Sequence, residues 1–297
     1  MSHPLHGLMT ALVTPFKNDE IDFTSLQKLL DYQKKGGVKT VVVAGSTGEV
    51  PTLSKEEYNE LIKHAVEFAG GLNIVAGCGS SSTKIAVDMA TSAEKIGASA
   101  LMCTVPAYNK PTQEGIWLHF KAVHDATNLP IMLYTIPSRT GTDFTDETIL
   151  RLAQLPRIVA IKDGGPDIER PLRMSAKLSD FSILAGDDSA ATLFYAQGGS
   201  GLVSVASNVM PRTMSRLCAL LQESRLQEAI TLQQKLFPMY KAMFIETNPI
   251  PVKYAVSLLG LCEPDLRMPL CALSKDNQEK VEIAMKIAKE LEDLPWD

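Results

Sequence analysis

The sequence lacks any apolar stretch long enough to cross a membrane. Its continuous apolar runs, such as residues 41–44, are only a few residues long, whereas a spanning helix needs about 20. The first seven residues carry no lysine or arginine, and the apolar run at 8–13 is stopped by Pro15 without a small-residue cleavage site. We therefore expect no membrane partner and no secretory signal, which predicts a cytoplasmic protein.

Patterns typical of disulfide-rich, metal-binding and nucleic-acid-binding proteins are also missing. The 5 cysteines are an odd number without a CxxC pair, which predicts reduced thiols. His119 and His124 are five residues apart on a predicted helix and point about 140° away from each other, so no metal site is expected. A net charge of −5, from 29 basic and 34 acidic residues, argues against a nucleic-acid partner.

No glycine-rich phosphate loop is present either. The first predicted strand runs into Thr14-Pro15-Phe16 instead of the Gly-rich turn of a dinucleotide-binding fold. Residues 198–201 are rich in glycine but lack the lysine and the spacing of a P-loop. We therefore expect neither a nucleotide nor any other cofactor.

The chain does contain a regular alternation of short apolar runs with segments of helical spacing. Eight strand-like runs recur at a mean spacing of about 28 residues, the size of one βα unit with short loops. Thr24 with Gln27, and Ser54 with Glu57, have the spacing of capping boxes and predict helix starts. The predicted strands are 8–13, 40–44, 73–76, 100–103, 130–134, 158–162, 181–185 and 202–205.

Eight such units predict an α/β fold, specifically a (β/α)8 TIM barrel. The competing architecture, an open doubly wound sheet, usually has fewer strands. After Val205 helical patterns dominate from about residue 211 to residue 292. We therefore predict a catalytic barrel over residues 1–210 and a C-terminal helical extension, residues 211–297, packed on the barrel.

Catalytic groups of such barrels lie where the strands end, and Lys162 ends the sixth predicted strand. Side-chain alternation predicts that Lys162 and Ala160 share one face of the strand, while Val159 and Ile161 share the other. An inward-facing lysine lies in a low-dielectric site, which lowers the pKa of an amine and lets it attack a carbonyl carbon. A solvated lysine just beyond the strand end explains the spacing equally well.

Tyr134 favours the catalytic interpretation, because it ends the neighbouring strand at the level of Lys162. A phenol beside an amine can transfer protons, although a lone tyrosine here is more often a core residue. Ser46 and Thr47, in a turn flanked by glycines, can bind a small carboxylate or form a plain turn. Arg139 can bind a second carboxylate in a bidentate way, or be a lone surface arginine.

The acidic pair Asp187-Asp188 has two interpretations as well. It can belong to a metal or acid–base site, but Asp188 precedes Ser189-Ala190-Ala191 and is more typical of a helix cap. We assign it no catalytic role.

Several motifs together resemble one known family, the pyruvate-dependent class I aldolases that include dihydrodipicolinate synthases and N-acetylneuraminate lyases. The similarity covers nearly the whole chain, and its last motif also has prolines where a helix would begin. The motifs are LVTPF at 12–16, GSTGE at 45–49, YTIPSRTG at 134–141, IK at 161–162, GDD at 186–188 and NPIPVK at 248–253.

The resemblance implies a lyase in which Lys162 forms a Schiff base with the ketone of pyruvate. The derived enamine then attacks the aldehyde of a second substrate. By the same resemblance Tyr134 exchanges protons with Ser46 and with Tyr108 of the partner subunit, while Thr47 holds the pyruvate carboxylate.

The resemblance also implies a second substrate and an assembly. The main chain of Val203 would line the pyruvate pocket, and Arg139 resembles the synthase arginine that binds L-aspartate-4-semialdehyde in diaminopimelate and lysine biosynthesis. The alternative is a sister aldolase that acts on another aldehyde or on a 2-keto-3-deoxy sugar acid. A tyrosine lent across an interface requires an oligomer, and the family is usually a homotetramer built as a dimer of dimers.

Some positions depart from the family pattern. Ser46 stands where many synthases have threonine, which keeps the hydroxyl, and the loop 163–167 replaces the more usual Glu-Ala-Thr-Gly. At the positions that bind inhibitory lysine in some members, this chain has a cationic residue that would repel the ligand's ammonium group. Weak or absent feedback inhibition by lysine is therefore predicted from Lys55, Tyr58, Ile85 and Ala107.

Overall fold

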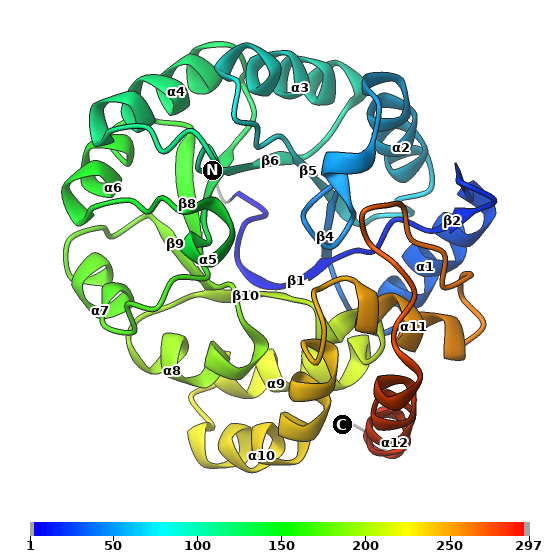
Figure 1. Cartoon of the computed structure of the whole chain (residues 1–297). Coiled ribbons are helices and arrows are strands. Elements are labelled where there is room, and N and C mark those ends of the chain that lie inside the picture. The colour runs from blue at the N-terminus through cyan, green and yellow to red at the C-terminus, as the bar shows by residue number, and fades with distance from the viewer. Residues whose placement is uncertain (1–2, 294–297) are drawn as a thin grey trace.

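The computed structural model describes residues 3–293 and contains a closed barrel of eight parallel strands ringed by helices (Figure 1). Each barrel strand pairs with the next barrel strand along the chain, and β10 closes the ring against β1. The barrel strands are β1 (Gly7–Ala11), β4 (Thr40–Val43), β5 (Asn73–Gly77), β6 (Ala100–Thr104), β7 (Ile131–Thr135), β8 (Ile158–Asp163), β9 (Ser182–Ala185) and β10 (Gly201–Ser204).

This confirms the predicted barrel, because every predicted strand lies within two residues of an observed one. The alternation of short strands and amphipathic helices is a local property of the sequence, which explains why the strands were predicted accurately. The sequence did not reveal the short antiparallel pair β2 (Phe16–Lys17) and β3 (Glu20–Ile21).

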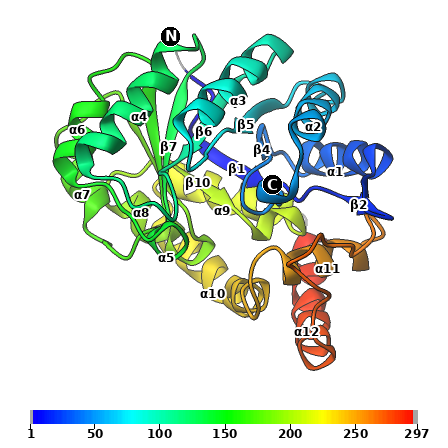
Figure 2. The ribbon, with the colours of Figure 1, turned by 45° about the horizontal axis from the view of Figure 1, so that its top comes forward.

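Helices surround the barrel and continue beyond it in the chain (Figures 1 and 2). They are α1 (Phe23–Lys35), α2 (Lys55–Glu67), α3 (Thr83–Ile96), α4 (Gln113–Asp125), α5 (Pro137–Thr140), α6 (Asp146–Leu152), α7 (Arg170–Ser175), α8 (Ala191–Ala196), α9 (Pro211–Gln222), α10 (Leu226–Met243), α11 (Ile250–Leu258) and α12 (Lys275–Glu292).

One of the two predicted capping boxes is correct. Ser54 accepts from the main-chain N–H of Glu57, whose carboxylate accepts from the N–H of Ser54. The prediction for Thr24 is wrong, because Asp22 caps α1 and accepts from the N–H of Ser25. The Asp22 carboxylate, two residues before Thr24, therefore accepts the hydrogen bond in the first turn of α1 that Thr24 was expected to accept.

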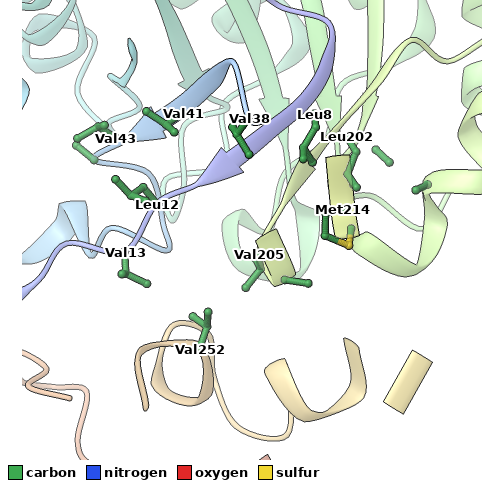
Figure 3. Packing of buried hydrophobic residues seen from close by; sticks show 14 of the residues in the cluster. Leu8, Leu12, Val13, Val38, Val41, Val43, Leu202, Val205, Met214 and Val252 are labelled. Carbon is green, nitrogen blue, oxygen red and sulfur yellow. The ribbon is translucent and has the colours of Figure 1, made fainter. Parts of the chain in front are cut away.

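Two hydrophobic clusters follow from the alternation of strand side chains. Inward-facing residues, among them Met9, Met132 and Leu184, fill the barrel. Outward-facing residues pack against the helices, and Val252 of α11 points toward Val13 and Val205 (Figure 3). The C-terminal helices therefore share the outer core of the barrel.

The segment after residue 210 forms α9 to α12. α9 lies in the ring of helices and packs against β1 and α1, whereas α10 to α12 project from one side of the barrel (Figure 2). Near the end of α12, Glu292 accepts from the main-chain N–H groups of Arg212 and Thr213 at the start of α9. The predicted barrel, residues 1–210, and the predicted extension, residues 211–297, each end outside the described residues, at 1–2 and 294–297 respectively. Within 3–293, no helix is long and apolar enough to span a bilayer.

Candidate active site

The centre of the site is the pair Lys162 and Tyr134 on neighbouring strands. They are register partners on β8 and β7, as the sequence predicted. The Lys162 amine lies 4.1 Å from the centre of the Tyr134 ring, and the residues are only 5% and 3% exposed. A buried amine thus lies against a phenol, both fixed by strands of the barrel.

The strand that carries Lys162 contains an irregularity. Ile131 pairs with Ile158 but Met132 pairs with Ala160, so Val159 is an extra residue. Val159 packs against the inner cluster, and its predicted place beside Ile161 is therefore wrong. Alternation resumes at Ala160, which lies inside the barrel while Ile161 lies outside, so the next residue, Lys162, returns to the inner face.

Ser46 and Thr47 lie in a tight turn after β4. The N–H of Gly48 donates to Gly45 O at 3.1 Å, and the N–H of Glu49 donates to Ser46 O at 3.1 Å. A Cβ on Gly48 would lie 3.2 Å from both a main-chain nitrogen and a main-chain oxygen, so glycine fits this turn best. The close packing fixes the two hydroxyl-bearing residues at the end of the strand.

A buried ion pair holds the far end of this turn. Lys253 of α11 donates to the carboxylate of Glu49, and both side chains are inaccessible to solvent. Lys253 also donates to Asp265 O at 2.9 Å, while the N–H of Arg267 donates to Glu49 at 3.1 Å. Burial lowers the pKa of Lys253, although the charge of Glu49 opposes that shift.

Arg139 lies on the short helix α5, at the end of β7. It is exposed, and its Nη2 donates to the main-chain O of Asn248 at 2.9 Å. The side-chain amide of Asn248 donates to Thr47 Oγ1 at 3.0 Å. The sequence carries no separate signal for Asn248, because its motif matches a helix start with prolines in the first turn, which α11 provides.

Val203 lies inside the barrel on β10, where it is fully buried and pairs with Met9. The following residue, Ser204, donates its hydroxyl to the carboxylate of Asp188. Asp188 also accepts from the main-chain N–H groups of Val205 and Ala206, each at 3.0 Å. Asp188 thereby fixes the end of β10.

The predicted helix-capping role of Asp188 is wrong. Its neighbour Asp187 is the N-cap of the 3-10 helix η2 (Asp188–Ala190) and accepts from the N–H of Ser189. Asp188 is 1% exposed, and burial raises its pKa to about 6.

A second network, for which the sequence carries no signal, supports the ends of β7 and β8 next to Lys162. Arg170 of α7 donates to Asp163 at 3.1 Å and to Asp143 at 2.9 Å. Asp143 also accepts from the hydroxyl of Thr135. Burial raises the pKa of Asp163, and the charge of Arg170 offsets only part of this rise. The unusual loop after Lys162 is thus joined to the loop after Arg139.

A cavity of about 860 Å³ opens beside these residues. Ser46, Arg139 and Asn248 line it, whereas Lys162, Tyr134, Thr47 and Val203 are buried and do not line it. The four residues predicted to control lysine inhibition, Lys55, Tyr58, Ile85 and Ala107, line the same cavity.

Tyr108 differs from the other predicted site residues because its side chain is 93% exposed. Its backbone has a φ of 70°, and its N–H donates a hydrogen bond to Thr140 O at 3.3 Å, which holds Tyr108 near α5, the helix that carries Arg139. Among residues 3–293, the hydroxyls of Ser46, Tyr108 and Tyr134 make no hydrogen bonds to one another. The same part of the chain contains no group of three His, Cys, Asp or Glu side chains placed to hold a metal ion.

Comparison with known proteins agrees with this geometry. The model of the dihydrodipicolinate synthetase family matches residues 4–288. The 4-hydroxy-tetrahydrodipicolinate synthase of Rickettsia typhi is 48% identical over 277 residues, which cover 93% of this chain and 94% of that protein.

Solved structures are similar throughout the fold. The 4-hydroxy-tetrahydrodipicolinate synthase of Methylacidiphilum fumariolicum SolV is 41% identical, with a TM-score of 0.94 and 97% of each chain covered. The dihydrodipicolinate synthase of Acinetobacter baumannii, solved with pyruvate, is 38% identical, with a TM-score of 0.93 over 96% of this chain and 99% of that one. A monomeric dihydrodipicolinate synthase variant is 39% identical, with a TM-score of 0.93, and the match covers 96% of this chain and 97% of that one. The chain therefore belongs to the dihydrodipicolinate synthetase family and is an enzyme of the pyruvate-dependent aldolase class.

Proposed function

We propose that this enzyme is a 4-hydroxy-tetrahydrodipicolinate synthase, which condenses pyruvate with L-aspartate-4-semialdehyde in diaminopimelate and lysine biosynthesis. The observation that carries the proposal is the buried contact between the Lys162 amine and the Tyr134 ring. Relatives of 45–48% identity over most of the chain carry the same enzyme name.

In the proposed reaction the neutral Lys162 amine attacks the ketone carbon of pyruvate. The C–N bond forms, the ketone oxygen leaves as water, and an imine results. Loss of a methyl proton converts the imine to an enamine, whose carbon attacks the aldehyde and forms the new C–C bond. We assign these proton transfers to the hydroxyl of Tyr134, whose ring lies against the Lys162 amine, together with Ser46, which lines the cavity.

The remaining predicted residues bind the substrates. We assign the pyruvate carboxylate to Thr47 and the main chain of Val203, and the carboxylate of the second substrate to Arg139. A guanidinium binds a carboxylate with two parallel hydrogen bonds, and Arg139 is exposed and lines the cavity. We propose no cofactor, because the imine on Lys162 supplies the electron sink that enamine formation needs.

We also propose a homotetramer in which Tyr108 of the partner subunit completes the proton relay. The exposure of Tyr108, in a strained left-handed conformation beside the cavity, supports an interface role. The cytoplasmic location expected from the sequence stays a prediction.

The test is mass spectrometry after treatment with pyruvate and sodium borohydride, which reduces an imine to a stable adduct. We expect one pyruvyl adduct that maps to Lys162, and none in Lys162→Ala. The enzyme should then consume L-aspartate-4-semialdehyde together with pyruvate. A folded protein without the adduct would refute the Schiff-base mechanism, whereas an adduct without condensation would refute only the second substrate.

A further inference from the structure

We infer that Asn248 is a positioning residue that aligns the two carboxylate-binding residues, Thr47 and Arg139. The inference rests on the proposed function and deepens it. Asn248 lies between α10 and α11, far from both residues in the sequence, and is 6% exposed. It contacts Thr47 through its side chain and Arg139 through its main chain.

The direction of the side-chain bond determines what Thr47 can do. The Asn248 amide donates to Thr47 Oγ1 at 3.0 Å, so this oxygen acts as the acceptor. The hydroxyl hydrogen of Thr47 then remains available to a different acceptor. A carboxylate accepts hydrogen bonds and donates none, so Asn248 prepares Thr47 to donate to pyruvate.

The second contact acts on Arg139. Its Nη2 donates to the main-chain O of Asn248 at 2.9 Å, which limits the freedom of an otherwise exposed side chain. Thr47 follows β4 and Arg139 follows β7, and the C-terminal segment joins these two strand ends. One residue thus sets the relative placement of the groups that bind the two substrates.

The surroundings keep Asn248 in place. One turn further along, Lys253 of α11 forms the buried ion pair with Glu49, two residues after Thr47. The carboxylate of Glu49 also accepts from the N–H of Arg267. The turn that carries Thr47 is therefore held to the C-terminal segment at two points.

Two variants change the side-chain contact with Thr47 and leave the main-chain acceptor of Arg139 in place. Asn248→Ala removes the bond to Thr47 but keeps the main-chain acceptor of Arg139. We expect KM for pyruvate to rise about 3- to 10-fold, the worth of one hydrogen bond, with KM for L-aspartate-4-semialdehyde changed less than about 2-fold. Asn248→Asp has the size of asparagine but can only accept, so it turns the Thr47 hydroxyl away from the substrate. Its KM for pyruvate should exceed that of Asn248→Ala.

The coupling is measured with borohydride trapping against pyruvate concentration, which does not involve the second substrate. In a Thr47→Val background, Asn248→Ala should raise the pyruvate concentration needed for half-maximal adduct formation by less than about 2-fold, because its partner is already missing. Asn128→Asp makes the same chemical change in the connection between α4 and β7, away from the cavity lining, and should bind pyruvate like the wild type. Thermal unfolding of each variant shows that the protein is folded.

Several results would overturn the inference. They are additive effects of Thr47→Val and Asn248→Ala, an unchanged KM for pyruvate in Asn248→Ala, or a KM for pyruvate in Asn248→Asp that does not exceed that of Asn248→Ala. The last would mean that the Thr47 hydroxyl donates to Asn248 instead of accepting. Failure of the proposed function is distinct, since the wild-type protein would then form no pyruvyl adduct, or would form it without condensing L-aspartate-4-semialdehyde.

Discussion

The amine of Lys162 faces the ring of Tyr134 at 4.1 Å, and the two residues are register partners on adjacent parallel strands. Hydrogen bonds between β7 and β8 set this relationship, so it does not depend on the conformation of a loop. A catalytic pair on strands is held more precisely than a pair on loops. The loops around it supply the groups that bind substrate.

The first prediction concerns the Tyr134 hydroxyl. Tyr134→Phe keeps the ring inside the barrel and should lower kcat by about 10²- to 10⁴-fold, the usual contribution of a proton-transfer group. Steady-state kinetics measure the change. Tyr195→Phe, which removes a buried hydroxyl on α8, should leave kcat within about 2-fold of the wild type. A Tyr134→Phe enzyme with near-normal kcat would contradict the assigned proton transfer.

Arg139 distinguishes the synthase from a sister aldolase. Arg139→Ala should reduce kcat/KM for L-aspartate-4-semialdehyde by about 10- to 100-fold, because a charged hydrogen-bond partner is lost. Pyruvate adduct formation should change little. Arg225→Ala removes an arginine that is paired with Glu223 and Glu228 on the surface and serves as the control. Equal activity of Arg139→Ala and wild type would favour a different aldehyde.

The buried pair of Lys253 and Glu49 should contribute strongly to stability. Lys253→Met leaves the Glu49 carboxylate buried without its cation, and should lower the free energy of unfolding by about 3–5 kcal/mol. The double variant with Glu49→Gln should lose less than the sum of the single variants, because the two residues are coupled. Urea unfolding tests both statements, and strict additivity would show that the pair is not coupled.

Asp188 should make stability depend on pH. Burial raises its pKa from 3.8 to about 6, so between these values the folded protein binds the proton more tightly than the unfolded chain. Its contribution is therefore complete below pH 4 and is lost as the pH rises through 6, a change of up to about 3 kcal/mol.

Asp188→Asn lacks this titration. We expect the stability of the wild type minus that of the variant to fall between pH 4 and pH 7, as measured by urea unfolding at several pH values. A difference that stays constant or rises with pH would show that the three donors to Asp188 outweigh its desolvation.

L-Lysine should inhibit this enzyme weakly or not at all. Lys55 lines the cavity together with Tyr58, Ile85 and Ala107, and its charge repels an ammonium group. The measurement is the condensation rate at increasing L-lysine concentration. Inhibition at sub-millimolar concentration would mean that Asp88, which lines the same cavity, attracts the ligand more strongly than Lys55 repels it.

Local patterns determined much of this protein in advance. The period of two along a strand placed Lys162 inside the barrel, and the order of strands placed Tyr134 beside it. The same reasoning failed at Val159, where a bulge adds one residue to the strand. A bulge depends on the partner strand and leaves no periodic signal.

Only the tertiary structure decided which distant residues support the site. Asn248 meets Thr47 across 201 positions of sequence, and Lys253 meets Glu49 across 204. Asp188 was predicted to cap a helix, but the end of β10 offers it three donors at once. Strand and helix periodicity arises from neighbouring residues, whereas these contacts depend on how the C-terminal segment and the loops pack on the closed barrel.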